Sequence, residues 1–187
     1  EPPAKALIIL LSKTPGRLLP TIRSRCMSLD LRAVPSGELA DWLGAHTDAA
    51  GDDIEAAIKL AGGAPGKALA LAQNADLVLR PLRQYVGAFP RGNPQQIHMF
   101  SDMLALAKNG AAHDLFWDVL GQTLEAQAIY AATGNWEGAY GPIALAKPTL
   151  TWANLSRELA DWRGARDGLN MNKKTVLLHA LERVSAA

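Results

Sequence analysis

The stretch ALIILLSKTPGRLLPTIRSRC, residues 6–26, decides how the first part of this fold is interpreted. It begins with the continuous apolar run ALIILLS (6–12), which is rich in branched side chains and ends just before TPG. A short run of this kind is typical of a strand that is buried on both faces of a parallel sheet. A second candidate strand, MSLDL (27–31), follows the basic sequence RSRC. We therefore expect two strands here, joined by a basic segment.

The pattern becomes helical after the second run, and three short helices are expected between residues 36 and 80. Ser36 is a candidate N-cap of the first helix. Asp52 and Glu55 make a capping-box pattern for the second helix. Pro65 suits the first turn of the third helix, because a proline there gives up no helical hydrogen bond. This region is therefore predicted to be a small helical domain.

The segment AFPRGNPQQ, residues 88–96, combines proline, glycine and asparagine and is the best linker candidate in the chain. Beyond it, Asn93 is predicted to cap a helix that has Pro94 as its first residue. GNWEGAYGP (134–142) is predicted to be a loop, and Asn172 is a candidate cap for a last helix. The rest of the chain is therefore predicted to be a helical bundle. Its apolar positions at helical spacing are Ile97, Phe100, Leu104, Trp152, Leu155, Leu159, Trp162, Val176, Leu177 and Leu181.

The 187 residues are 49% hydrophobic and 20% charged, which suffices for one domain or two small ones with a buried core. No apolar run approaches the roughly 20 residues that span a bilayer, so no membrane partner is expected. The formal net charge of +1 argues against an autonomous nucleic-acid binder, although the first 32 residues carry six basic and two acidic side chains. Because the sequence begins at Glu1, it is expected to be an internal piece of a longer protein.

Several residue types that often carry chemistry have a simpler interpretation here. The one cysteine, Cys26, excludes an internal disulfide and a cysteine-based zinc site, and it is expected to pack as a small apolar side chain. The four histidines are scattered without metal-ligand spacing, and Trp42, Trp152 and Trp162 fall on apolar helix faces. The glycine-rich GGAPGKAL (62–69) lacks the phosphate-loop spacing GxxxxGK followed by Ser or Thr. No metal or other cofactor is therefore expected.

The run ALIILLSKTPGRLLPTIRSRC resembles the sensor 1 strand and the Ser-Arg-Cys motif of the AAA+ clamp-loader ATPases. Strand, polar tip, LLPTIRSRC and a following DL strand come in that family's order, and the initial EPP resembles the end of the preceding helix. The resemblance implies a mainly α fold that covers the whole chain. It implies that residues 1–32 are the C-terminal remnant of an AAA+ α/β core, residues 33–90 a three-helix lid, and residues 91–187 a helical collar for oligomerisation.

Within that family, the chain resembles a subunit that does not hydrolyse ATP. The hydrolysing subunits carry a sensor 2 arginine in the pattern GSxRxAL, and Gly66 stands here where that arginine would be. The Ser-Arg-Cys motif is nevertheless present. The resemblance therefore implies a subunit that acts on the ATP site of a neighbour.

The resemblance also implies roles for individual residues. Arg25 would be an arginine finger in trans, because a planar, always charged guanidinium stabilises the charge that gathers on the γ-phosphate. Ser24 would shape the turn, and Cys26 would anchor it by packing inward. Ser12, at the tip of the strand, matches sensor 1, and Arg23 is a weaker candidate for the subunit interface. No nucleotide-binding residue is expected in this piece of the chain.

The expected function is that of a cytoplasmic, non-hydrolysing clamp-loader subunit, which helps to load the sliding clamp onto primed DNA and has no activity by itself. Its expected partners are the gamma/tau and delta subunits, with the clamp and the primed DNA contacted through the complex. One alternative is an ATP-hydrolysing gamma/tau or replication factor C-like subunit, which a phosphate loop upstream would favour. The other is a structural helical adaptor, which an Arg25 buried against its own chain would favour.

Overall fold

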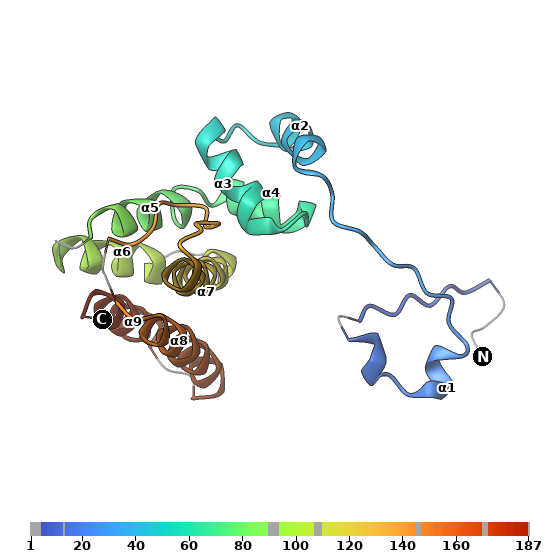
Figure 1. Cartoon of the computed structure of the whole chain (residues 1–187). Coiled ribbons are helices and arrows are strands. Elements are labelled where there is room, and N and C mark those ends of the chain that lie inside the picture. Colours follow the sequence, from blue (N-terminus) through green and yellow to red (C-terminus); the bar gives the residue numbers. More distant parts are fainter. Residues whose placement is uncertain are drawn as a thin grey trace. The chain divides into compact units, whose positions relative to one another are not determined.

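The computed structural model describes residues 5–12, 14–89, 94–106, 110–144, 147–169 and 172–186. The chain divides into two compact units, residues 1–32 and residues 33–187 (Figure 1). Helices make up most of the described residues, so the prediction of a mainly α fold is confirmed.

The first unit contains two short helices and extended chain. The 3₁₀ helix η1 spans Pro15–Arg17, and the one-turn helix α1 spans Pro20–Arg23. The described residues of this unit form no strand, so the prediction of strands at 6–12 and 27–31 was wrong. An extended segment becomes a strand only when its backbone groups pair with a neighbouring strand, and no such pairing forms among these residues.

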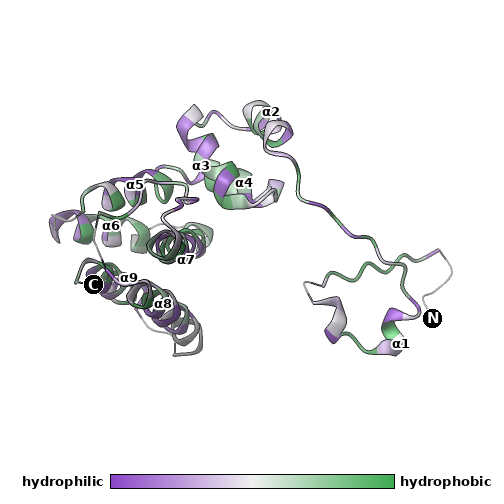
Figure 2. Cartoon of the chain, in the orientation of Figure 1, coloured by the Kyte–Doolittle hydropathy of each residue, from purple (hydrophilic) through white to green (hydrophobic). Residues whose placement is uncertain are grey.

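The apolar side chains of both extended segments remain in contact with solvent. Leu11 is 92% exposed and Met27 is 98% exposed. Figure 2 shows the first of these segments as a hydrophobic stretch of chain outside any helix. The apolar pattern therefore identified residues that are suited to burial, and the first unit does not bury them.

The three helices predicted between residues 36 and 80 are present in the second unit. They are α2 (Ser36–His46), α3 (Gly51–Ala61) and α4 (Pro65–Gln73). A further helix, α5 (Leu79–Gly87), was not predicted. Its buried residues follow helical spacing, so the signal was present in the sequence; they are Leu79, Leu82, Tyr85 and Val86.

The bundle predicted for the rest of the chain consists of four helices among the described residues. They are α6 (Pro94–Leu106), α7 (Gly110–Thr133), α8 (Thr149–Leu169) and α9 (Lys173–Ala186). The long helices α7 and α8 pack against each other, and α6 packs against α9 (Figure 1). The segment 134–142 is a loop between α7 and α8, as predicted.

Some helix ends follow their local sequence signals. Pro65 and Pro94 are the first residues of α4 and α6, as predicted. The Oδ1 atom of Asn172 accepts hydrogen bonds from the backbone N–H groups of Lys174 at 3.0 Å and Thr175 at 3.3 Å. Asn172 is therefore the N-cap of α9, as predicted.

Other predicted caps are wrong. Ser36 is already the first residue of α2, whose N-cap position is taken by Pro35 without a side-chain hydrogen bond. Asp52 lies inside α3, whose N-cap position is taken by Ala50. A capping side chain has to belong to a residue with non-helical backbone, so a helix that begins one or two residues early loses its cap. The predicted cap Asn93 lies outside the described residues.

The second unit has a continuous apolar core that runs from α3 to α9. It includes Leu60 of α3, Leu82 of α5 and Leu177 of α9. Phe89 and Ile97, which lie close to the two ends of the predicted linker, are both part of it. The domain boundary in the linker stays a prediction, and the apolar core contains residues from both sides of it.

The tryptophans differ in their burial. Trp152 is fully buried, as predicted, and Trp162 is half-buried beside His179, with 5.5 Å between the ring centroids. Trp42 was also expected in the core, but it is 36% exposed. Its ring stacks on that of His46, with 4.4 Å between the centroids. The buried face of α2 is formed by Leu39 and Leu43. Trp42 lies at the edge of this face, so its side chain is only partly covered.

The substitution Leu82→Ala removes part of a fully buried side chain of α5 and leaves a cavity in the core. We expect it to lower the free energy of unfolding by about 2–5 kcal/mol, the range for such core substitutions. Urea denaturation followed by far-UV circular dichroism measures the change. The control is Leu150→Ala in α8, where the leucine is 69% exposed and the expected change is below about 0.5 kcal/mol. Equal effects would contradict the packing of α5 into the core.

Candidate functional site

The Ser-Arg-Cys motif forms a tight turn directly after α1. The hydroxyl of Ser24 donates a hydrogen bond to the carbonyl of Thr21 at 3.2 Å. The backbone N–H of Arg25 donates to the carbonyl of Ile22 at 3.1 Å. These bonds use carbonyls that the end of a helix leaves without an intrahelical partner. The turn that carries Arg25 is therefore shaped by its own local hydrogen bonds.

The side chains around this turn are in contact with solvent. Arg23, Arg25 and Cys26 are all exposed. Among the described residues, no carboxylate lies within ion-pairing distance of Arg25. The prediction that Cys26 packs inward is wrong, because its thiol is exposed. The apolar residues that flank the turn bury no core in this unit, so they offer the thiol no place to pack.

A hollow of about 550 Å³ lies beside the turn. Ser12, Ser24 and Cys26 all line it, together with Arg23. The hydroxyl of Ser12 accepts a hydrogen bond from the backbone of Thr14 at 3.2 Å. The structure thus brings three of the predicted site residues to one hollow, which offers hydroxyl and guanidinium donors, and Arg25 does not belong to its lining.

The glycine that stands in place of a sensor 2 arginine lies in the first turn of α4. Gly66 is exposed, and a Cβ at this position meets no atom within 4 Å outside its own turn, so the described part of the chain does not require a glycine there. The neighbouring Lys67 Nζ lies 3.9 Å from Oδ2 of Asp118 in α7. Arg163 of α8 pairs with the same carboxylate, beside a hollow of about 330 Å³. The lysine of this motif therefore connects α4 to α7.

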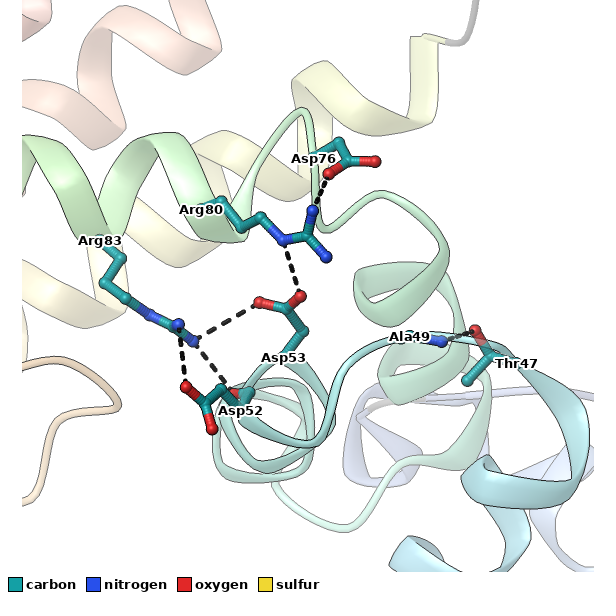
Figure 3. Close-up of polar contacts among 7 residues, drawn as sticks. All are labelled: Thr47, Ala49, Asp52, Asp53, Asp76, Arg80 and Arg83. Atoms are coloured by element: carbon teal, nitrogen blue, oxygen red, sulfur yellow. Dashed lines mark hydrogen bonds and ion pairs between the residues drawn. The ribbon is translucent and has the colours of Figure 1, made fainter.

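A buried carboxylate joins α3 to α5. Asp53 is 1% exposed, and Figure 3 shows its carboxylate facing the guanidinium groups of Arg80 and Arg83. Arg80 Nε donates to Asp53 Oδ2 at 2.8 Å, and Arg83 Nη2 lies 3.5 Å from Oδ1. Arg80 also pairs with Asp76, and Arg83 Nη2 donates to the carbonyl of Asp52 at 3.1 Å. The first turn of α3 is therefore tied to α5 by charged hydrogen bonds.

The same network reaches the loop between α7 and α8. The hydrogen bond to Asp53, together with the nearby carboxylate charges, raises the pKa of Arg80, so this guanidinium stays charged. The guanidinium of Arg83 lies 6.0 Å from the centroid of the Tyr140 ring. Burial raises the pKa of Tyr140, an effect that the charge of Arg83 opposes and that of Asp53 increases. The phenol therefore stays neutral beside the charged cluster.

This cluster was not predicted from the sequence, where Asp52 was interpreted as part of a cap and Asp53 had no predicted role. One signal was present, because Asp76, Arg80 and Arg83 have the spacing of a charged helix face, although Asp76 itself lies in the turn before α5. The approach of α3 to that face is a long-range contact that no local pattern contains.

The described residues contain no group of three or more His, Cys, Asp or Glu side chains that could hold a metal ion. His46 lies beside Trp42 and His179 beside Trp162, each within a pair of aromatic rings. In the same part of the chain, no helix is both long enough and apolar enough to cross a membrane.

Comparison with known proteins gives matches over parts of the chain. Residues 1–35 match the family model described as "DNA polymerase III, delta subunit". The chain is 41% identical over 73 residues to the DNA polymerase III subunit delta' of Escherichia coli, a match covering 39% of this chain and 22% of that protein. It is 32% identical over 100 residues to the subunit delta' of Pseudomonas aeruginosa, covering 48% of this chain and 30% of that protein. No solved structure gives a significant match.

The N-terminal segment that contains the turn at Arg25 is thus similar to a family of DNA polymerase III delta subunits. Both of the relatives named above are delta' subunits, and this chain is similar to them over the aligned segments. Those segments cover less than a third of either relative.

The substitution Asp53→Asn removes the charge that two guanidinium groups face. Arg80 and Arg83 are both partly exposed, so water compensates in part, and we expect a loss of about 1–2 kcal/mol in the free energy of unfolding. The matched control is Asp52→Asn, whose side chain is 87% exposed and whose expected loss is below about 0.5 kcal/mol. Urea denaturation of both variants measures the difference. A loss as small for Asp53→Asn as for the control would show that the cluster does not stabilise the fold.

Proposed function

We propose that this chain belongs to a clamp-loader subunit of the delta' kind, which helps to load the sliding clamp onto primed DNA without hydrolysing ATP itself. One observation carries the proposal: the segment that matches the family model holds Arg25 exposed on a turn with its own hydrogen bonds. In the assembled complex, Arg25 acts in trans on the ATP bound by a neighbouring subunit.

The chemistry of phosphoryl transfer explains the need for such a residue. Negative charge gathers on the γ-phosphate oxygens, and catalysis consists mostly of positioning and of stabilising that charge. A guanidinium provides a planar fork of donors and does not lose its proton at physiological pH. An arginine without an intramolecular carboxylate partner is free to bind the phosphate of another subunit, and Arg25 has this property among the described residues.

The start of α4 supports the absence of hydrolysis by this subunit. A hydrolysing subunit of the family carries its own sensor 2 arginine, and Gly66 stands at that position here. The adjacent Lys67 does not replace it, because its ammonium group faces Asp118 within the second unit. The charge that acts on ATP would then come from Arg25 alone in this chain.

The rest of the chain would serve assembly. Residues 33–90 are proposed as the lid, formed by α2, α3 and α4, with α5 packed into the larger core. Residues 91–187 are proposed as the collar, through which the subunit assembles with gamma/tau and delta subunits. The clamp and the primed DNA are contacted through that complex, and the setting is DNA replication in the cytoplasm.

The exposure of Arg25 also bears on the alternative of a structural adaptor. An adaptor requires no free arginine at this turn, and a guanidinium packed against its own chain would have favoured it. The exposed side chain supports the finger instead.

We expect Arg25→Ala to leave assembly of the complex intact and to lower its DNA-stimulated ATP turnover in part. An arginine supplied in trans raises the rate of hydrolysis at its own ATP site roughly 10³–10⁵-fold. The substitution should therefore abolish hydrolysis at one site, while the other ATP sites of the complex continue to hydrolyse. Steady-state ATPase and clamp-loading assays of the assembled complex measure the effect.

Two further variants serve as controls for Arg25→Ala. Arg17→Ala removes another exposed arginine of the same unit, from η1, and should leave turnover unchanged. Arg25→Lys keeps the charge but not the planar fork, so it should restore little of the lost rate. Normal ATPase and loading rates with Arg25→Ala would refute the finger assignment.

By itself, this chain is expected not to hydrolyse ATP, because it contains no phosphate-binding loop of the GxxxxGK type. The Gly66→Arg variant should be equally inactive, since a sensor 2 arginine cannot act without bound nucleotide. A coupled phosphate-release assay on both purified proteins tests this. Turnover by the chain that persists through further purification and follows the protein peak would contradict the prediction.

A further inference from the structure

The turn that carries Arg25 continues a run of hydrogen bonds that begins with α1. The carbonyl of Leu19 accepts a bond from the backbone N–H of Ile22 at 2.9 Å. The carbonyl of Pro20 accepts one from the backbone N–H of Ser24, also at 2.9 Å. The bond from the Arg25 N–H to the carbonyl of Ile22 extends this run by one more step. The backbone of Arg25 is therefore connected to the start of α1 by successive local bonds.

Burial does not stabilise this run of bonds. α1 has four residues, none of which is buried, and residues 24–26 after it are exposed as well. A first helical turn fixes several backbone angles for one hydrogen bond, so isolated helices shorter than about 12 residues are marginal in water. The order of this turn therefore depends on the residues that begin it.

Pro20 restricts the backbone at the point where the turn begins. It is the first residue of α1, where the fixed φ of proline suits a helix and its missing N–H costs no helical bond. The proline ring also favours extended backbone in the preceding residue. Leu19 has this conformation, with φ of −56° and ψ of 137°. Both residues therefore lose little conformational freedom when the turn forms.

We propose that Pro20 is a positioning residue for Arg25, a role that lies within the first unit and rests on the proposed function. The two residues are five positions apart and are connected by the hydrogen bonds of one turn. A guanidinium stabilises the charge on a phosphate only while it is held in the productive geometry. The rate therefore follows the fraction of molecules in which the turn is formed, and Pro20 raises that fraction.

The turn also distinguishes Arg25 from the neighbouring arginine. Arg23 lines the hollow beside the turn, whereas Arg25 does not. In an extended chain, two residues at this spacing lie on the same side of the backbone. Formation of the turn therefore gives the two guanidinium groups different surroundings, and it leaves Arg25 outside the hollow.

The chain offers a graded series of substitutions and a matched control. Pro20→Ala removes the ring but keeps a good helix former, and Pro20→Gly gives the backbone the most freedom. The control is Pro15→Gly, because Pro15 is also the first residue of a short helix, η1, in the same unit. The bond that η1 makes from the Leu18 N–H to the Pro15 carbonyl ends before Pro20. Pro15→Gly should therefore leave the turn at Arg25 unchanged.

The ¹³Cα chemical shifts of Ile22 and Arg23, measured by NMR in the whole subunit, report how much of the turn is formed. We expect these shifts to be most helical with Pro20, less so with Pro20→Ala and least with Pro20→Gly. Losing the proline should lower the equilibrium constant for the turn roughly two- to fivefold. The amide resonances of α7 and α8 show whether each variant is folded. Unchanged shifts in Pro20→Gly would overturn the role of Pro20 in ordering the turn.

ATP turnover by the complex, assembled with the whole subunit, tests the effect on Arg25. Pro20→Gly should lower kcat by less than Arg25→Ala does and leave KM for ATP unchanged, and Pro20→Ala should have a smaller effect than Pro20→Gly. Because Pro20 acts through Arg25, the double variant Arg25→Ala with Pro20→Gly should lose no more than Arg25→Ala alone. Pro15→Gly should leave kcat unchanged.

The outcomes separate this role from the proposed function. Full turnover with Pro20→Gly, or additive losses in the double variant, would overturn the positioning role while Arg25 keeps its own. Full turnover with Arg25→Ala would overturn the proposed function and, with it, the effect of Pro20 on catalysis. The chemical shifts would still decide whether Pro20 orders the turn.

Discussion

The second unit depends on the burial of one continuous set of apolar side chains, from Leu60 in α3 to Leu177 in α9. Removing apolar surface from water stabilises a fold by about 25 cal/mol per Å², and this driving force acts wherever the helices meet. Leu82, Phe89 and Ile97 extend the core across the predicted linker. The helices on the two sides of that linker therefore share one apolar core, and separating them would expose apolar side chains on both sides.

Polar contacts add direction to this packing. Apolar burial has little directional preference, whereas a charged hydrogen bond requires two groups at particular positions. The hydrogen bond between Asp53 and Arg80 helps to set how α3 meets α5. Lys67 and Asp118 add an ion pair between α4 and α7. Tyr85 adds a third such contact, because its hydroxyl donates to a backbone carbonyl of α9. Each contact links helices that are apart in the sequence, so together they favour one arrangement of the core.

The first unit shows what happens where this burial is missing. Its apolar segments stay exposed, and the turn that carries Arg25 is shaped by hydrogen bonds within a few residues. An arginine on such a turn is accessible, but nothing within the unit holds its guanidinium at a particular place. The order of this turn is therefore local, whereas the order of the second unit comes from contacts between helices that are far apart in the sequence.

The sequence by itself determined the features whose atoms lie within about four residues of each other. Pro65 and Pro94 begin helices, Asn172 caps one, and the Ser-Arg-Cys turn is present where its motif lies. The tertiary structure decided the features that need partners far along the chain. The apolar runs 6–12 and 27–31 were predicted to be strands and are not, because a strand requires a neighbouring strand to pair with. The burial of α5, the charges gathered around Asp53 and the exposure of the thiol were also decided by which surfaces meet, which no local pattern encodes.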